Sequence, residues 1–281
     1  MLAESLAAIA PTLRADDELI VVDSASSPPV EPTPIGTIVR AGVKGLSIAR
    51  NVGASNASKP ILVFTDDDCR PQAGWLDILD AAFDAPDVGF VIGQVKADVD
   101  NAYLPFDAVA RPSQTFVGPT DPIDLGHGAC MAFRREAYLG CGGADDRMGA
   151  GSRLLSAEDH DLFLRLLVTG WKGKYEPAAL VLHRDWRTHR QVVQYCWGVG
   201  LGTGAMVGKM TRVAGLGVTG PLLKRRFGSD GFGELALGLR KRSKSMIAAS
   251  TLKLTGTTAG LLLGLVLRRQ GQRFRPRRND P

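Results

Sequence analysis

The sequence is poor in cysteine and in aromatic residues. Its 281 residues include only four cysteines, and the aromatic fraction is 6%. The cysteines stand far apart, at positions 69, 130, 141 and 196, and none of them forms a C-x-x-C pair. This spacing argues against a disulfide framework, so we expect reduced thiols in a reducing compartment.

Two further absences bear on the class of protein. The first residues, MLAESLAAIAPTLRADDE, have no basic start followed by an apolar run, so we expect no secretory leader. No G-x-G-x-x-G motif joins a predicted strand to a predicted helix, and the only glycine-dense run, at 198–208, follows no strand. A dinucleotide-binding oxidoreductase therefore receives little support from the sequence.

Acidic residues are scarce in the last part of the chain. The net charge of +5 divides into −8 over residues 1–204, with 18 Lys/Arg against 26 Asp/Glu, and +13 over residues 205–281, with 16 against 3. A basic tail can meet nucleic acid or an anionic membrane. It lacks the interleaved aromatic residues of a base-stacking surface, so we expect no nucleic-acid partner.

Apolar runs and polar breaks predict alternating strands and helices in the first 190 residues. The predicted strands are 19–22, 61–64, 88–95, 129–133 and 174–182, and the predicted helices are 45–58, 71–83, 134–139 and 157–169. Residues 24–36, with four prolines, and 96–126 are predicted as loops. The order β-α-β-α-β favours an α/β fold in which helices cover a parallel sheet.

The amino-acid composition changes from about residue 190 onwards. Residues 246–267 form 22 mostly apolar positions with one charge, Lys253, and this length can span a hydrocarbon core. Gly256, Gly260 and Gly264 recur at the spacing that lets helices approach closely in lipid. Basic residues flank the segment on both sides, at 240–244 and 268–278, and leave its orientation open. The segment is thus a membrane-spanning or membrane-associated helix, or an amphipathic or buried helix of a soluble domain.

Three aspartates, Asp66, Asp67 and Asp68, follow the predicted strand 61–64 directly. In an extended segment Asp66 and Asp68 point to the same side, and oxygen donors of this kind suit Mg²⁺ or Mn²⁺. The carboxyl ends of parallel strands are also where open α/β sheets bind ligands. The alternatives are a solvated strand end and a cap for the next helix.

Two more polar features have both a structural and a chemical interpretation. Glu158 and Asp159 open a predicted helix, where acidic residues favour the helix dipole but can also supply a general base. His183 ends an apolar strand, where a histidine is often structural but can also complete a carboxylate metal site.

In order and texture, the chain resembles the family 2 glycosyltransferases, inverting enzymes that use nucleotide-sugar donors. The resemblance covers roughly residues 2 to 205 and is carried by DELIVVDSAS (17–26), GLSIARNVGASNAS (45–58), ILVFTDDDCRPQAGWL (61–76), GHGACMAFRREAYLGCGGADDRMGAG (126–151) and SAEDHDLFLRLLVTGWKGKYEPAALVLH (156–183). It implies a GT-A fold, Rossmann-like with a mostly parallel sheet and flanking helices, over residues 1–190. Residues 191–281 would then be a glycine-rich, basic helical tail.

The resemblance also implies a role for individual residues. Asp159 would be the catalytic base, and Asp68 with His183 would bind Mg²⁺ or Mn²⁺. The residues expected on the donor side are Asp23, Arg50, Asn51 and Asp66, with Arg50 placed to support Asp66. The residues expected on the acceptor side are Gly142, Gly143 and Glu158.

One departure from the family pattern concerns the beginning of the fold. Family members open with an apolar strand before the helix that matches Leu2–Leu13, whereas this sequence begins inside that helix. Either the strand lies upstream of this start, or the protein is a shortened copy and a non-catalytic scaffold. The first alternative predicts a transferase at the cytoplasmic face of a bacterial-type cell membrane, acting on a saccharide or lipid-linked acceptor in the synthesis of cell-envelope polysaccharide.

Overall fold

The computed structural model describes residues 1–98, 111–184 and 186–267. The chain forms two compact units. The first contains Met1–Asp145 and Asp159–Trp186, and the second contains Asp146–Glu158 and the helices from Arg187 onwards. The change of composition near residue 190 therefore lies close to the point where the chain enters the second unit.

The first unit contains two β-sheets. Strands β1 (Ile20–Ser24) and β2 (Thr37–Ala41) pair in parallel as a two-stranded sheet. The larger sheet has the order β3-β7-β5-β8-β4, with β6 also paired to β8. Its strands are β3 (Ile61–Phe64), β4 (Cys69–Pro71), β5 (Val88–Ala97), β6 (Gln114–Phe116), β7 (Met131–Arg134) and β8 (Lys172–His183). Among the described residues the two sheets share no hydrogen-bonded ladder.

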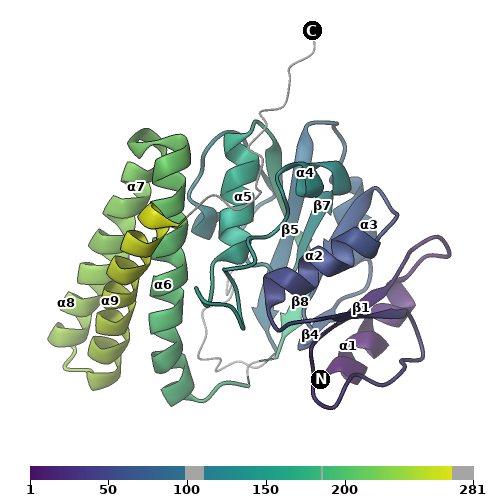
Figure 1. The fold of residues 1–281 in the computed structure, drawn as a ribbon, viewed down its shortest axis with the longest axis horizontal. Helices are drawn as coiled ribbons and strands as arrows, with labels where there is room; N and C mark the ends of the chain where they lie inside the picture. Colours follow the sequence, from purple (N-terminus) through teal and green to yellow (C-terminus); the bar gives the residue numbers. More distant parts are fainter. Residues whose placement is uncertain (99–110, 185, 268–281) are drawn as a thin grey trace, which may run out of the picture. The chain divides into compact units, whose positions relative to one another are not determined.

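Alternating side chains give the larger sheet two buried faces. On one face Phe90 of β5 and Phe133 of β7 pack with Phe163 of α5 (Glu158–Val168). This face is also covered by α2 (Leu46–Asn56) and α4 (Arg135–Gly140). On the other face Val91 and Val95 pack against α3 (Trp75–Ala81). Helices thus cover both faces of the larger sheet (Figure 1).

The α/β class is confirmed, but the expectation of a mostly parallel sheet is corrected. In the larger sheet only β5 and β8 pair in parallel, whereas β7 lies between β3 and β5 and runs antiparallel to both. The chain enters β7 from a loop, without the helical crossover that a parallel neighbour requires. Strands β3, β5 and β8 still run in one direction, so their carboxyl ends lie at one edge of the sheet.

Three short strands are absent from the sequence-based expectation. Thr37–Ala41 follows the proline-rich loop, and Gln114–Phe116 falls inside 96–126, which was predicted as loop; residues 99–110 of that loop lie outside the described residues. Cys69–Pro71 overlaps at Pro71 the predicted helix 71–83, which instead begins at Trp75. Each is three to five residues long, too short for a clear alternation of apolar and polar residues.

The second unit is a bundle of four helices: α6 (His189–Ala214), α7 (Leu216–Phe227), α8 (Glu234–Arg240) and α9 (Lys244–Val266) (Figure 1). A π-helical segment, Gly228–Gly233, joins α7 to α8. The predicted apolar segment 246–267 is confirmed as a helix, α9. A long helix of this composition packs its small residues inward, as the contacts of its glycines show.

The expected close approach at Gly256, Gly260 and Gly264 is also present. A Cβ added to Gly260 would lie 2.0 Å from the carbonyl oxygen of Leu201, and one added to Gly204 on α6 would lie 2.2 Å from that of Thr257. The two helices run in the same direction with their backbones in contact along three turns. Any side chain larger than hydrogen at these positions would separate them.

Candidate active site

The candidate residues converge where four strands of the first unit end or begin at one edge of the sheet. Phe64, the last residue of β3, pairs with Met131, the first residue of β7. Cys69 of β4 pairs with His183, the last residue of β8. Residues that flank these positions, namely 66–68, 127–129, Arg184 and Trp186, therefore share the edge. The local sequence changes there from apolar to polar, as expected for strands that leave a core.

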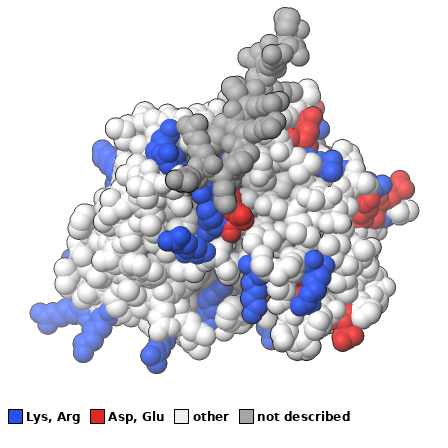
Figure 2. Space-filling view, viewed as in Figure 1, with Lys and Arg blue, Asp and Glu red and all other residues white. Residues whose placement is uncertain are grey.

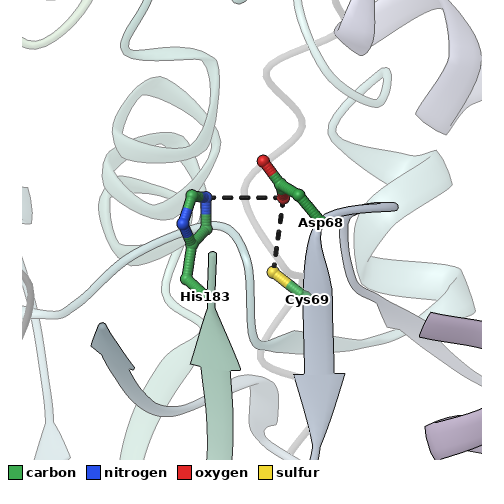
Figure 3. A group of neighbouring side chains, drawn as sticks. All are labelled: Asp68, Cys69 and His183. Carbon is green, nitrogen blue, oxygen red and sulfur yellow. Dashed lines mark hydrogen bonds and ion pairs between the residues drawn. The ribbon is translucent and has the colours of Figure 1, made fainter. Parts of the chain in front are cut away.

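Asp68 and His183 lie together, as the metal assignment requires. His183 Nε2 is 3.4 Å from Asp68 Oδ1, and the Cys69 thiol is 3.7 Å from the same oxygen (Figure 3). One ligand atom from each of the three residues lies within 4.8 Å of the others. A carboxylate and an imidazole are a donor pair that divalent cations accept, so these residues fit a metal site.

The other oxygen of Asp68 has a separate partner. The Trp186 indole Nε1 donates a hydrogen bond of 3.1 Å to Asp68 Oδ2. This bond turns Oδ1 towards His183 and Cys69, in the way that outer hydrogen bonds orient metal ligands. Burial of Cys69 raises the pKa of its thiol, so at neutral pH the sulfur carries its proton.

Asp66 forms an ion pair with Arg50, as expected from the resemblance. Arg50 Nη2 lies 3.1 Å from Asp66 Oδ1 and donates a second hydrogen bond, of 3.3 Å, to the Gly128 carbonyl oxygen. Burial raises the pKa of the Asp66 carboxyl, and the Arg50 charge opposes that rise. The Arg50 side chain is buried, at 6% exposure, whereas the Asp66 side chain is 26% exposed, so solvent reaches the pair from the carboxylate side.

Asp159 lies on the other side of the same glycine. The Gly128 amide donates to Asp159 Oδ2 at 2.8 Å, and the His160 amide donates to Oδ1 at 2.8 Å. Burial raises the pKa of the Asp159 carboxyl, but the positive charges of His160 and Arg50 outweigh it and leave the pKa below its ordinary value. Asp159 is thus ionised at neutral pH, the state that a general base needs.

Gly128 links the two carboxylates and has no room for a side chain. A Cβ there would lie 2.9 Å from both Cβ and Oδ2 of Asp159. We expect Gly128→Ala to displace Asp159 and lower kcat/KM about 10- to 100-fold, because a misplacement near 1 Å can cost that much. Steady-state kinetics measures this.

Gly140→Ala is the matched control for Gly128→Ala. Nothing lies within 4 Å of a Cβ added to Gly140, so this variant should keep the parent rate. Equal rates for the two variants would mean that Gly128 does not position Asp159.

Asn51 supports a loop. Its side-chain amide donates to the Ala144 carbonyl at 2.8 Å, and its Oδ1 accepts from the Ala144 amide at 2.9 Å and from the Tyr138 hydroxyl at 2.8 Å. These bonds hold the turn at Gly142 and Gly143, whose φ angles are +87° and +69°. A donor-binding role for Asn51 would have to be shared with this one.

Asp23 organises the turn after β1. It accepts hydrogen bonds from the Ser26 amide at 2.8 Å and the Val30 amide at 3.3 Å, and forms an ion pair of 2.6 Å with Arg40. These amide hydrogen bonds hold the pKa of Asp23 below its ordinary value. The ionised carboxylate thus fixes the 24–30 segment at the carboxyl end of β1.

Glu158 is the first residue of α5, next to Asp159. It is buried, at 8% exposure, and a Cβ added to Gly149 would lie 3.0 Å from its carboxyl carbon. The 146–158 loop therefore packs closely around this side chain.

Three residues of the site, Cys69, Gly128 and Trp186, were not assigned from the sequence. Cys69 directly follows the aspartate triplet, and Gly128 lies in the GHGAC segment that carries part of the resemblance. No local sequence pattern distinguishes a functional cysteine or glycine at these positions from a structural one. Trp186 follows His183 by three residues. Only the strand register and the chain path bring these three to the carboxylates.

Comparisons with known proteins identify the family and the fold. The family model described as "Glycosyl transferase family 2" matches residues 1–140. The "Pre-mycofactocin glycosyltransferase" of Mycobacterium tuberculosis, in two strains, is 31% identical over 188 residues, which are 60% of this chain and 39% of that protein. The chain thus corresponds to about two fifths of the length of these relatives.

Solved structures share the fold at low sequence identity. "Mannosyltransferase PcManGT from Pyrobaculum calidifontis in complex with GDP-Man and Mn2+" superposes with a TM-score of 0.55 at 17% identity, over 94% of this chain and 83% of that one. S. aureus TarS, residues 1–349 in complex with UDP, has a TM-score of 0.57 at 11% identity, over 93% and 86% of the two chains. Both likenesses concern the GT-A architecture.

Proposed function

The chain belongs to glycosyl transferase family 2, and on that premise we propose that it transfers a sugar from a nucleotide-sugar donor to an acceptor hydroxyl with inversion at the anomeric carbon. One observation carries the proposal. The Asp68–His183 pair, the Asp66–Arg50 pair and the ionised Asp159 converge at one sheet edge, and the Gly128 peptide joins the last two. A leaving-group site and a base are thus adjacent.

The donor would bind on the Asp66 and Asp68 side. A divalent cation, Mg²⁺ or Mn²⁺, held by Asp68 and His183 would neutralise negative charge on the leaving diphosphate. Asp66, paired with Arg50, is partly exposed and can accept hydrogen bonds from the donor's ribose. Asp23 holds the turn that would face the base. The fold neighbours contain GDP-Man with Mn²⁺ and UDP, which makes guanine and uracil nucleotides the first donors to test.

Asp159 would act on the acceptor. Its carboxylate takes the proton from the acceptor hydroxyl while that oxygen forms the bond to the anomeric carbon and the bond to the diphosphate oxygen breaks. One displacement inverts the anomeric centre and needs no covalent intermediate. The resemblance to the family assigns Gly142, Gly143 and Glu158 to the side from which a saccharide or lipid-linked acceptor would approach.

Donor titration tests the proposal directly. We expect heat from binding of UDP or GDP in isothermal titration calorimetry with Mn²⁺, and at least tenfold weaker binding after chelation with EDTA, because the diphosphate loses its counter-ion. TDP is the third nucleotide to compare. Nucleotide binding that does not respond to Mn²⁺, or no binding of any of the three, would favour a non-catalytic scaffold.

We further propose that the second unit binds an anionic membrane surface. By length and composition α9 can cross a membrane, and Lys253, its only charge after the first residue, pairs with Glu234 at 3.0 Å. Leu239, Leu262 and Val266 are exposed at 59%, 62% and 73%. Basic residues gather where α8 meets α9, at 240–244 (Figure 2). The run from Arg268 to Arg278 lies outside the described residues.

Vesicle binding tests this surface. We expect the full chain to sediment with vesicles that contain anionic lipid and far less with neutral ones. The double variant Lys241→Gln/Arg242→Gln should bind anionic vesicles at least tenfold more weakly, since each basic residue near the surface contributes about 1 kcal/mol. Lys44→Gln/Lys59→Gln in the first unit is the matched control, and equal losses in the two variants would contradict the assignment.

A further inference from the structure

The metal-site cluster contains a sulfur ligand that a magnesium or manganese site does not need. Cys69 lies on β4 directly across from His183 on β8, so the two side chains leave the same face of the sheet. Both point at the same Asp68 oxygen (Figure 3). Cys69 and His183 come from paired strands, and Asp68 directly precedes Cys69, which fixes the spacing of the three residues before any ion arrives.

The spacing matches a small tetrahedral ion. With Zn–S near 2.3 Å, Zn–N near 2.05 Å and Zn–O near 2.1 Å, tetrahedral angles place the ligand atoms about 3.3 to 3.6 Å apart. The observed separations are 3.4 Å from His183 Nε2 to Asp68 Oδ1 and 3.7 Å from Cys69 Sγ to the same oxygen, and all three atoms lie within 4.8 Å. Small side-chain rotations close the remaining difference.

We propose that Cys69 makes this a zinc-inhibited site, in which Zn²⁺ takes Asp68, Cys69 and His183 together and excludes the ion that supports transfer. The inference rests on the proposed function, since inhibition requires that the site serve the donor. As the Zn–S bond forms, the thiol releases its proton to the buffer. Thiolate and imidazole favour Zn²⁺ over Mn²⁺ or Mg²⁺, and three protein ligands leave a four-coordinate ion only one open position for a diphosphate oxygen.

Burial strengthens this preference. Cys69 is fully buried and His183 is 8% exposed, so the ion would be held largely out of water. The Trp186 hydrogen bond to Asp68 Oδ2 leaves Oδ1 as the oxygen that faces the other two ligands. A hard cation with octahedral demands would keep its waters and use the oxygen and nitrogen alone.

Metal competition in the full chain tests the proposal, with Cys69→Ala as the variant and Cys130→Ala as its matched control. Cys130 is as buried as Cys69 and belongs to the same face of the core, but its thiol donates to the Ala179 carbonyl instead. We expect Cys69→Ala to lower the ratio of Zn²⁺ to Mn²⁺ affinity at least tenfold, and Cys130→Ala to leave it within twofold. An unchanged ratio in Cys69→Ala would overturn the proposal.

Co²⁺ as a spectroscopic stand-in gives a second readout that does not depend on transfer. The parent chain and Cys130→Ala should show a sulfur-to-cobalt charge-transfer band in the near ultraviolet, and Cys69→Ala should lack it. Circular dichroism establishes that each variant is folded, and Cys69→Ser provides a polar replacement of similar size. A band that persists in both folded Cys69 variants would assign the sulfur ligand elsewhere and refute the site.

The two proposals fail in different ways. Suppose that transfer proceeds with Mn²⁺ and that added Zn²⁺ either does not inhibit it or inhibits the parent and Cys69→Ala at the same concentration. The zinc proposal is then wrong, and the proposed transferase function is unaffected. If the Co²⁺ band is present and depends on Cys69 but no nucleotide binds with Mn²⁺, the proposed function fails. The inhibition by zinc then fails with it, and only the metal site remains.

Discussion

Asp159→Asn is expected to lower kcat by about 10²- to 10⁴-fold, the contribution of a positioned general base. The amide keeps the size of the carboxylate, and its oxygen can still accept from the Gly128 amide, which now donates at 2.8 Å to Oδ2. It cannot take a proton from an acceptor hydroxyl. The measurement is the initial rate of sugar transfer, with donor binding by calorimetry expected to stay within threefold.

Asp67→Asn is the matched control for this variant. It removes a carboxylate from the same site region, but Asp67 is the exposed member of the triplet and accepts no side-chain hydrogen bond from Arg50 or His183 among the contacts described. We expect its rate to stay within about threefold of the parent. Full activity in a folded Asp159→Asn protein would eliminate Asp159 as the base.

The pH profile gives an independent test of the same residue. Because the charges of His160 and Arg50 hold the pKa of Asp159 below its ordinary value, the carboxylate should remain ionised as pH falls from neutral towards about 4, the usual range for aspartate. The acidic limb of kcat/KM should therefore lie below that range. A limb near pH 6 would indicate a different base.

Arg165→Met is expected to lower the free energy of unfolding by about 3–5 kcal/mol, the cost of leaving a buried charge without its partner. Both Arg165 and Asp161 have fully buried side chains, and Arg165 Nε lies 2.8 Å from Asp161 Oδ2. The guanidinium also donates to the carbonyl oxygens of Cys141 and Gly143, at 2.8 and 2.6 Å. Methionine keeps much of the volume but satisfies none of these groups. Urea unfolding measures the loss.

Arg14→Met makes the same substitution at an exposed ion pair. The Arg14 side chain is 49% exposed and forms surface ion pairs with Asp80 at 2.9 Å and Asp17 at 3.1 Å, so its removal should cost about 0–1 kcal/mol. The double variant Asp161→Leu/Arg165→Met removes the stranded charge and should regain part of the loss. Similar losses for Arg14→Met and Arg165→Met would show that the buried pair is no more valuable than a surface one.

Asp159→Asn and Arg165→Met test different roles, the first a role in proton transfer and the second a role in stabilising a loop. Arg165 on α5 and Asn51 on α2 both donate hydrogen bonds to the 141–144 turn. Each can therefore affect the site without contacting substrate. A fall in the stability of Arg165→Met with little change in its rate of transfer would show that the loop and the Asp159 carboxylate, our proposed base, depend on different contacts.

Local patterns were sufficient for most of the elements and for the acidic residues of the site. The run 61–64 followed by three aspartates predicted both β3 and the carboxylates beyond it, and the apolar spacing at 157–169 predicted α5 with Asp159 in its first turn. These signals need only neighbours in the chain. The 246–267 segment was likewise visible from composition, and α9 is that helix.

Contacts between segments far apart in the chain decided the strand order and the helix packing, which the sequence did not predict. Strand β7 lies antiparallel between β3 and β5, which no local pattern indicates, because strand order depends on which edges are free when the chain returns. The partner face on α6, with Gly200 and Gly204 against α9, depends on packing between helices more than 50 residues apart. Asn51 turned out to bind a loop more than 90 residues away.

The sequence alone therefore determined the candidate side chains: carboxylates after a buried strand, an acidic pair at a helix start, a histidine at a strand end and a basic, apolar tail. The tertiary structure decided which of them meet. The register that sets Cys69 across from His183, and the glycine peptide that touches both Arg50 and Asp159, arise from contacts between distant segments. Such contacts follow from burying the whole core at once, since register is fixed by which faces are buried.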